Sequence, residues 1–191
     1  GASLELLEGK VLPGIAALSD ARDVPDAAFT FKRMPSTVFS GALQKRRPIV
    51  GGNWKLNPDS MAKLDGLIAN FAGIDTSHCD VYVCPSTLHL PYVLGKLKDR
   101  GSPVQVTPQN CNFSGCGAYT GEMAADQMVS MGMKWCLIGH SERRGEFGLP
   151  TPPESNTLLA TKLKYLLEKG MNVILAIGEP LPIREKGIEA V

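Results

Sequence analysis

Two patterns of hydrophobic and polar positions alternate along residues 48–191. Short apolar runs, rich in β-branched residues, predict five strands, at residues 48–52, 80–84, 103–107, 134–138 and 172–177. Between them the apolar positions follow a helical period, with one face formed by Leu64, Leu67, Ile68 and Phe71 and another by Leu159, Leu163, Leu166 and Leu167. Strands that are apolar throughout and separated by amphipathic helices indicate buried parallel strands with helical crossovers. The pattern therefore predicts an α/β fold built from βα units.

The first 47 residues lack this rhythm, and we expect them to form an N-terminal extension separate from residues 48–191. Residues 1–26 contain one candidate short helix, Leu4–Leu18, which Pro13 interrupts. Residues 31–47 hold five basic residues and no acidic one, a composition that resembles part of an organelle-targeting segment. An irregular, partly ordered extension is the alternative.

The composition excludes several classes of protein. The chain has 191 residues, a formal net charge of +1 and 43% hydrophobic residues, as is usual for a globular domain with a core. No stretch approaches the roughly 20 apolar residues that span a bilayer, so no membrane span is expected. The near-neutral charge gives no reason to expect nucleic-acid binding. Five cysteines, set mostly in apolar runs, favour a reducing compartment over a disulfide-linked secreted scaffold.

Candidate chemistry follows the first predicted strand, because functional groups of parallel α/β folds gather at the carboxyl ends of strands. Asn53 and Lys55 lie there, and strand alternation is expected to place both side chains on one side. A lysine and an amide together suit an anionic substrate that carries a carbonyl or phosphate group. A surface lysine with no such role is the alternative.

His140 follows the fourth predicted strand, just before a predicted helix start. Backbone N–H groups and the positive end of a helix dipole disfavour the imidazolium there, so the neutral ring could polarise a carbonyl by donating a hydrogen bond. Glu142 and Arg143 could form an ion pair beside it. A structural histidine before a capped, solvated helix start is the alternative.

Neither a metal site nor a P-loop is predicted. The three histidines lie far apart and no Cys-x-x-Cys spacing occurs. The glycine-rich segment Ser114–Gly121 lacks the Gly-Lys-Ser/Thr ending of a P-loop. We expect a projecting loop with Tyr119 and Thr120 near its tip, available as a contact surface.

Several motifs together resemble triosephosphate isomerase, and they occur in the order of that family. They are GNWK at residues 52–55, CPS at 84–86, QN at 109–110, GAYTGE at 117–122, IGHSERR at 138–144 and IGE at 177–179, so the resemblance covers residues 48–191. It implies a (β/α)8 TIM barrel, of which about five of the eight units are present, in addition to the N-terminal extension. It also implies the cofactor-free interconversion of dihydroxyacetone phosphate and glyceraldehyde 3-phosphate in glycolysis and gluconeogenesis.

The resemblance further implies roles for single residues. Lys55 would stabilise the anionic substrate, and Asn53 would help to position it. His140 would be the neutral electrophile that polarises the carbonyl and the enediolate, and Glu142 would be the supporting acid. Thr120, with Tyr119 beside it, would reach across a dimer interface. The expected partners are a triose phosphate and a second copy, or other chains that cover the open barrel, in the cytoplasm, a plastid or a mitochondrion.

The sequence also departs from the family pattern. Leu149–Pro153 resembles an insertion, and Ala176 stands where the family usually has cysteine. Residues 48–191 supply only about five βα units, without the family's catalytic-base glutamate, its lid and its later phosphate-binding loops. Because a general base contributes about 10²–10⁴ in rate, we expect this truncated barrel to be inactive alone.

Two other functions remain open at this stage. A degenerate barrel could serve as a structural or linker subunit of a larger assembly, in which another chain covers the open edges of the first and fifth strands. An orphan small-molecule binder is the third alternative. The opening residues Gly1–Leu4 also echo the family's final phosphate-binding loop, as in a permuted or tandem-fused chain.

Overall fold

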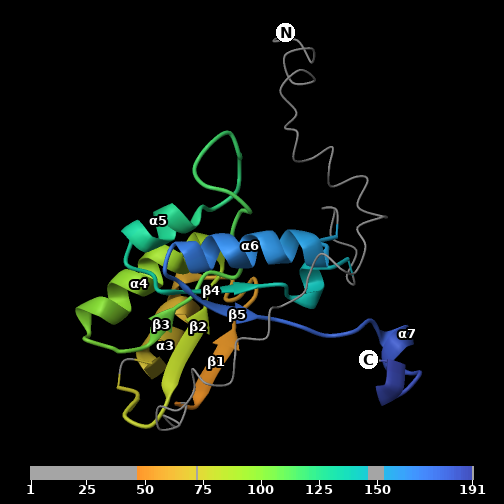
Figure 1. Cartoon of the computed structure of the whole chain (residues 1–191). Coiled ribbons are helices and arrows are strands. Elements are labelled where there is room, and N and C mark those ends of the chain that lie inside the picture. Colours follow the sequence, from red (N-terminus) through yellow and green to blue (C-terminus); the bar gives the residue numbers. More distant parts are fainter. Residues whose placement is uncertain (1–46, 72, 146–152, 191) are drawn as a thin grey trace, which may run out of the picture. The chain divides into compact units, whose positions relative to one another are not determined.

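The computed structural model describes residues 47–71, 73–145 and 153–190, in which strands and helices alternate (Figure 1). The strands are β1 (Ile49–Asn53), β2 (Asp80–Cys84), β3 (Gln105–Val106), β4 (Trp135–Ile138) and β5 (Asn172–Leu175). The α-helices are α3 (Met61–Phe71), α4 (Leu90–Asp99), α5 (Ala125–Ser130), α6 (Asn156–Glu168) and α7 (Leu181–Arg184). Single 3₁₀ turns are η4 (Thr87–His89), η5 (Ser141–Arg143) and η6 (Ile188–Ala190). The predicted α/β class is confirmed.

All strand pairings in the described residues are parallel. β1, β2 and β3 form one sheet, in which Asn53 pairs with Cys84, and β4 and β5 form another. The Leu137 N–H donates to the Pro108 carbonyl (2.8 Å), so β4 lies beside the segment that follows β3. β3 is shorter than predicted because Pro103 and Pro108, which flank it, have no N–H for a strand ladder.

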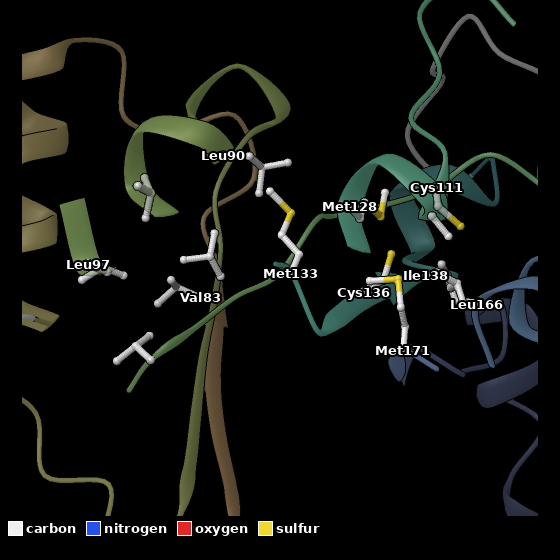
Figure 2. Packing of buried hydrophobic residues seen from close by; sticks show 14 of the residues in the cluster. Val83, Leu90, Leu97, Cys111, Met128, Met133, Cys136, Ile138, Leu166 and Met171 are labelled. Atoms are coloured by element: carbon white, nitrogen blue, oxygen red, sulfur yellow. The ribbon is translucent and has the colours of Figure 1, made fainter. Parts of the chain in front are cut away.

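The hydrophobic core lies between the strands and the helices that cover them. Helix α6 packs on β4 and β5, and α4 packs on β3 and α3. Figure 2 shows sulfur-containing side chains among the aliphatic ones of the core, with Met133 near Leu90 and Cys136 near Ile138. The helical faces predicted from the period are largely buried, but Leu167 is 56% exposed, so the prediction is wrong there.

The outer strands are less buried than their sequences predict. β2 and β4 are largely buried, whereas Ile49 and Val50 of β1 and Leu175 of β5 are exposed. Each outer strand has one strand neighbour within the described residues, and this leaves its other edge and side chains uncovered. The prediction of strands buried throughout is therefore wrong for β1 and β5.

Several predictions fall on residues outside the described ranges. These are the Leu4–Leu18 helix, the extension up to residue 46 and the first four residues of the Leu149–Pro153 insertion. Arg47, the last basic residue of the predicted extension, donates to the carbonyls of Thr76 (2.7 Å) and Cys79 (3.1 Å) and pairs with Asp80. No helix in the described ranges is long and apolar enough to cross a membrane.

Candidate functional site

A left-handed backbone turn places Lys55 after β1. The strand ends at Asn53, and Lys55 has φ of 55°, a conformation that costs a non-glycine residue about 1–2 kcal/mol. The Lys55 N–H donates to Asn53 Oδ1 (2.9 Å), which helps to hold the turn. Strand alternation therefore explains the position of Asn53 but not that of Lys55, which lies beyond the strand.

Lys55, His140 and Glu142 come together from the ends of β1 and β4, although 87 residues separate Lys55 from Glu142 in the sequence. Lys55 Nζ lies 2.6 Å from Glu142 Oε1, and His140 Nδ1 lies 3.4 Å from Glu142 Oε2. One carboxylate thus lies between an ammonium group and an imidazole ring, all partly exposed. We call Asn53, Lys55, His140 and Glu142 the strand-end cluster.

One hydrogen bond fixes the tautomer of His140. The Glu142 backbone N–H donates to His140 Nδ1 (3.2 Å), so Nδ1 is an acceptor and the neutral ring carries its hydrogen on Nε2. The predicted helix start is only the three-residue turn η5, for which His140 acts as the N-cap. The backbone hydrogen bond, rather than the dipole of a helix, therefore makes Nδ1 the acceptor of the ring and leaves Nε2–H as its donor.

A cleft of about 190 Å³ lies beside His140. It is lined by the end of β4, from Gly139 to Ser141, by Arg144, and by the segment 176–179 after β5. Gly139 has φ of 80°, and a Cβ on it would lie 2.8 Å from the Ala176 carbonyl oxygen. Only glycine therefore allows the two strand ends to approach this closely.

Arg144 joins the same two strand ends. Its guanidinium donates to the carbonyls of Gly139 (2.9 Å) and Ala176 (3.1 Å) and to Asn156 Oδ1 (2.8 Å). The planar guanidinium suits this fixed arrangement of three acceptors. Arg144 therefore holds one wall of the cleft in place.

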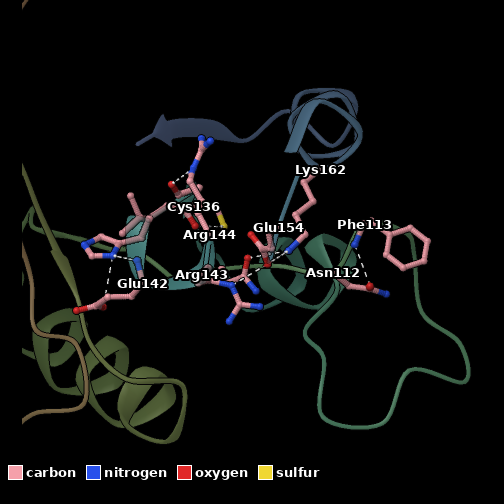
Figure 3. Close-up of polar contacts among 12 residues, drawn as sticks. Asn112, Phe113, Cys136, Glu142, Arg143, Arg144, Glu154 and Lys162 are labelled. Atoms are coloured by element: carbon pink, nitrogen blue, oxygen red, sulfur yellow. Dashed lines mark hydrogen bonds and ion pairs between the residues drawn. The ribbon is translucent and has the colours of Figure 1, made fainter. Parts of the chain in front are cut away.

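A buried ion-pair network lies behind the His140 turn (Figure 3). Glu154 Oε1 accepts hydrogen bonds from Arg143 Nε and Lys162 Nζ, each at 2.7 Å, and Lys162 Nζ also donates to Asn110 Oδ1 (2.9 Å). The side chains of Glu154 and Lys162 are only 4% and 5% exposed. The expected pair of Glu142 with Arg143 is wrong, because Lys55 pairs with Glu142 and Arg143 pairs with Glu154.

Sequence reasoning missed this network, although it left one signal. Lys162 lies three residues after Leu159 and four before Leu166, so it falls on the buried face of α6. A charged residue on the apolar face of a helix needs a buried partner. The spacing alone does not say that this partner is Glu154.

Tyr119 and Thr120 lie on a loop that projects from the rest of the described structure, drawn in green in Figure 1. Thr120 is exposed, and the partly buried ring of Tyr119 packs edge-on against Phe113, with ring centroids 5.5 Å apart. Among the hydrogen bonds of the described residues, none joins this loop to the strand-end cluster. The projecting loop is thus present and separate from the cluster.

Cys84, the last residue of β2, is not a reactive thiol. Burial raises the pKa of the Cys84 thiol to about 12, which keeps it protonated and unreactive at neutral pH. In the part of the chain that the structure describes, no group of three or more His, Cys, Asp or Glu residues is placed to hold a metal ion.

Comparisons with known proteins match the same part of the chain. The family model described as Triosephosphate isomerase matches residues 48–191. The cytosolic triosephosphate isomerase of Oryza sativa subsp. japonica is 37% identical over 144 residues, which are 74% of this chain and 54% of the rice protein. Triosephosphate isomerase of Chlorobium chlorochromatii is 39% identical over 75% of this chain and 55% of its own length. Triosephosphate isomerase of Coprinopsis cinerea is 40% identical over 72% of this chain and 52% of its own length. The chain spans about half the length of the curated relatives it matches.

Proposed function

The chain belongs to the triosephosphate isomerase family, and on this premise we propose that its strand-end cluster binds a triose phosphate and contributes to triose phosphate isomerisation. The observation that carries this proposal is that Glu142 holds both groups. Its carboxylate pairs with Lys55 Nζ and its backbone N–H donates to His140 Nδ1, so a cation and a ring with an Nε2–H donor lie around one residue. A phosphorylated sugar with a carbonyl group presents the complementary anion and acceptor.

Each group of the cluster has a distinct role in the proposed reaction. The proton moves between adjacent carbons through an enediolate, whose negative charge must be stabilised. His140 donates its Nε2–H to the carbonyl oxygen, and Lys55 provides positive charge beside it. Glu142 orients Lys55 through its carboxylate and His140 through its backbone N–H, which donates to Nδ1, and Asn53 Oδ1 accepts from the Lys55 N–H. These residues form the electrophilic half of an isomerase site.

The base that removes the proton is the other half of the site. Glu142 is engaged with Lys55, so we do not assign it this role. We propose that the base lies in the part of the family's length that this chain does not match. A polypeptide limited to residues 1–191 then has little or no isomerase activity, because a general base contributes about 10²–10⁴ in rate.

Substrate binding tests the proposal without requiring turnover. Calorimetric titration of the chain with dihydroxyacetone phosphate should detect binding, and Lys55→Met and His140→Gln should each weaken it by about tenfold or more. Lys63→Met is the matched control, since Lys63 lies on α3, outside the cluster, and forms an exposed pair with Asp59. Equal binding by all four proteins, or no binding to the unmodified chain, contradicts the proposal.

We also propose that the projecting loop forms part of a homodimer interface. Thr120 is exposed on this loop, and two leucines are almost fully exposed, Leu56 after β1 at 86% and Leu88 within η4 at 87%. Large apolar side chains exposed near one end of a sheet favour contact with another protein surface. A soluble compartment such as the cytosol suits this assembly, as the name of the rice relative suggests.

The second candidate function is a structural or linker subunit of a larger assembly. It is favoured by the exposed apolar residues of the outer strands, Ile49 and Val50 in β1 and Leu175 in β5. Uncovered strand edges of this kind recruit other chains or aggregate. If the purified 191-residue chain is monomeric, soluble and cooperatively folded, this function loses its main support.

A further inference from the structure

We propose that Gln109 is a positioning residue, which holds Lys55 in the conformation that the cluster needs for anion binding; this inference rests on the proposed function. Gln109 follows β3 and takes no part in the cluster itself. Its Nε2 donates one hydrogen bond to the Lys55 carbonyl and one to the Cys84 carbonyl, both at 2.8 Å. Both hydrogens of the amide are therefore used, and they join the ends of β1 and β2.

The left-handed backbone of Lys55 explains why such a residue is needed. Lys55 is the one non-glycine residue with positive φ in the described ranges, and its Cβ disfavours this conformation. Side-chain amides hold both of its backbone polar groups: Asn53 Oδ1 accepts from its N–H, and Gln109 donates to its carbonyl. Asn53 is only two residues away, whereas Gln109 is 54 residues away and ties the turn to the neighbouring strands.

The two hydrogen bonds of Gln109 also fix the end of β1 relative to the end of β2. The Cys84 carbonyl accepts from Gln109 and from the Trp54 N–H (3.0 Å), so Trp54 and Lys55 are both fastened to the end of β2. With the backbone held in this way, Lys55 Nζ reaches Glu142 Oε1 at 2.6 Å. Without the two hydrogen bonds from Gln109, Lys55 can relax to negative φ, which changes the direction of its Cα–Cβ bond and weakens its pair with Glu142.

Competitive acylation of the lysines tests this role directly. The folded chain is treated with limiting acetic anhydride, and the modification rate of each lysine is read by peptide mass spectrometry. Gln109→Leu should raise the Lys55 rate about two- to fivefold, the factor expected for loss of a partly exposed ion pair. Glu142→Gln should raise it similarly, and the double variant should add little, because both changes break the same contact.

The chain offers matched controls. Gln105→Leu removes another glutamine amide, which donates to the nearby Pro103 carbonyl (2.9 Å), and should leave the acetylation rate of Lys55 unchanged. Buried Lys162 reports on the fold and should keep its low rate in every variant. Gln109→Asn is the milder change; its shorter side chain cannot reach both carbonyls and should raise the Lys55 rate by a smaller factor.

Two results overturn the proposal. The first is an unchanged Lys55 rate in both Gln109→Leu and Gln109→Asn. The second is a parallel rise of Lys55 and Lys162, which indicates a general structural role. Protection of Lys55 by dihydroxyacetone phosphate in the unmodified chain tests the proposed function separately. If dihydroxyacetone phosphate does not protect Lys55 but the Gln109 variants still raise its acetylation rate, only the proposed function is contradicted. If the ligand protects Lys55 but the Gln109 variants leave its rate unchanged, only the role of Gln109 is contradicted.

Discussion

Removal of the buried Lys162 ammonium should strongly destabilise the fold. Lys162→Met keeps an unbranched side chain in place but removes the hydrogen bonds to Glu154 Oε1 (2.7 Å) and Asn110 Oδ1 (2.9 Å). Glu154, only 4% exposed, then keeps Arg143 as its single cation in the described network. Breaking a buried pair costs about 3–5 kcal/mol. Because Arg143 still compensates Glu154, we expect a loss of about 2–4 kcal/mol in the free energy of unfolding.

Urea unfolding at neutral pH, followed by circular dichroism, measures this loss. Lys164→Met is the matched control: Lys164 lies two residues away on α6, is 78% exposed and should change stability by less than about 0.5 kcal/mol. The double variant Glu154→Leu, Lys162→Met should be more stable than the sum of the two single losses, since it leaves no buried charge unpaired. A Lys162→Met loss below about 1 kcal/mol, or strictly additive losses, refutes this reasoning.

Three further predictions concern the helices, the cleft and the assembly. Hydrogen bonds from Lys169 and Tyr165 lower the pKa of Asp126, and burial with the Asp126 contact raises the pKa of Tyr165 to about 12, so this contact should stabilise the fold in the neutral range. This stabilisation is lost in acid as Asp126 is protonated, and in alkali as the pH rises from about 10 through the raised Tyr165 pKa. Asp126→Asn should therefore make the melting temperature depend less on pH in the acid range. Gly139→Ala should lower the free energy of unfolding in urea by about 1–2 kcal/mol or more, because Gly139 has positive φ and its new Cβ would meet the Ala176 carbonyl. Gly95→Ala, in the open middle of α4, is the control and should raise the free energy of unfolding by about 0.4–1 kcal/mol. Similar effects of both changes would contradict the role given to Gly139. Leu88→Glu should lower the dimer fraction in light scattering, with Leu181→Glu as an exposed control, and equal fractions for both would argue against the proposed interface.

The strands were predictable because each is a short apolar run, but their burial was not. The sequences of β1 and β5 resemble those of β2 and β4, but β2 lies between two strands and β4 between β5 and the segment after β3, whereas β1 and β5 each have a neighbour on one side within the described residues. The helical period likewise predicted the buried face of α6 at Leu159 and Leu166 but not the exposed position of Leu167. The hydrophobic pattern therefore predicts which side chains a segment can bury, whereas the position of the segment in the fold determines which of them are buried.

The members of the strand-end cluster could be proposed from the sequence, but the reasons for their geometry could not. Strand-end position and family resemblance pointed to Lys55 and His140. Their geometry comes from a left-handed residue, one backbone hydrogen bond to His140 Nδ1 and the amide of Gln109. The partners of Glu142 and Glu154 were also hidden, because Lys55 lies 87 positions before Glu142, and Glu154 is eight positions from Lys162 and eleven from Arg143, so only tertiary structure brings them together.

Reconstitution of activity tests the central claim most directly. Residues 1–191 are assayed for glyceraldehyde 3-phosphate formation, alone and after co-expression with the C-terminal βα units of the rice relative that lie beyond the matched region. We predict negligible turnover alone and measurable turnover in the complex, which Lys55→Met and His140→Gln abolish and Lys63→Met leaves intact. Turnover that survives both cluster substitutions, or a stable complex with no turnover, would contradict the claim that these strand ends form half of an isomerase site.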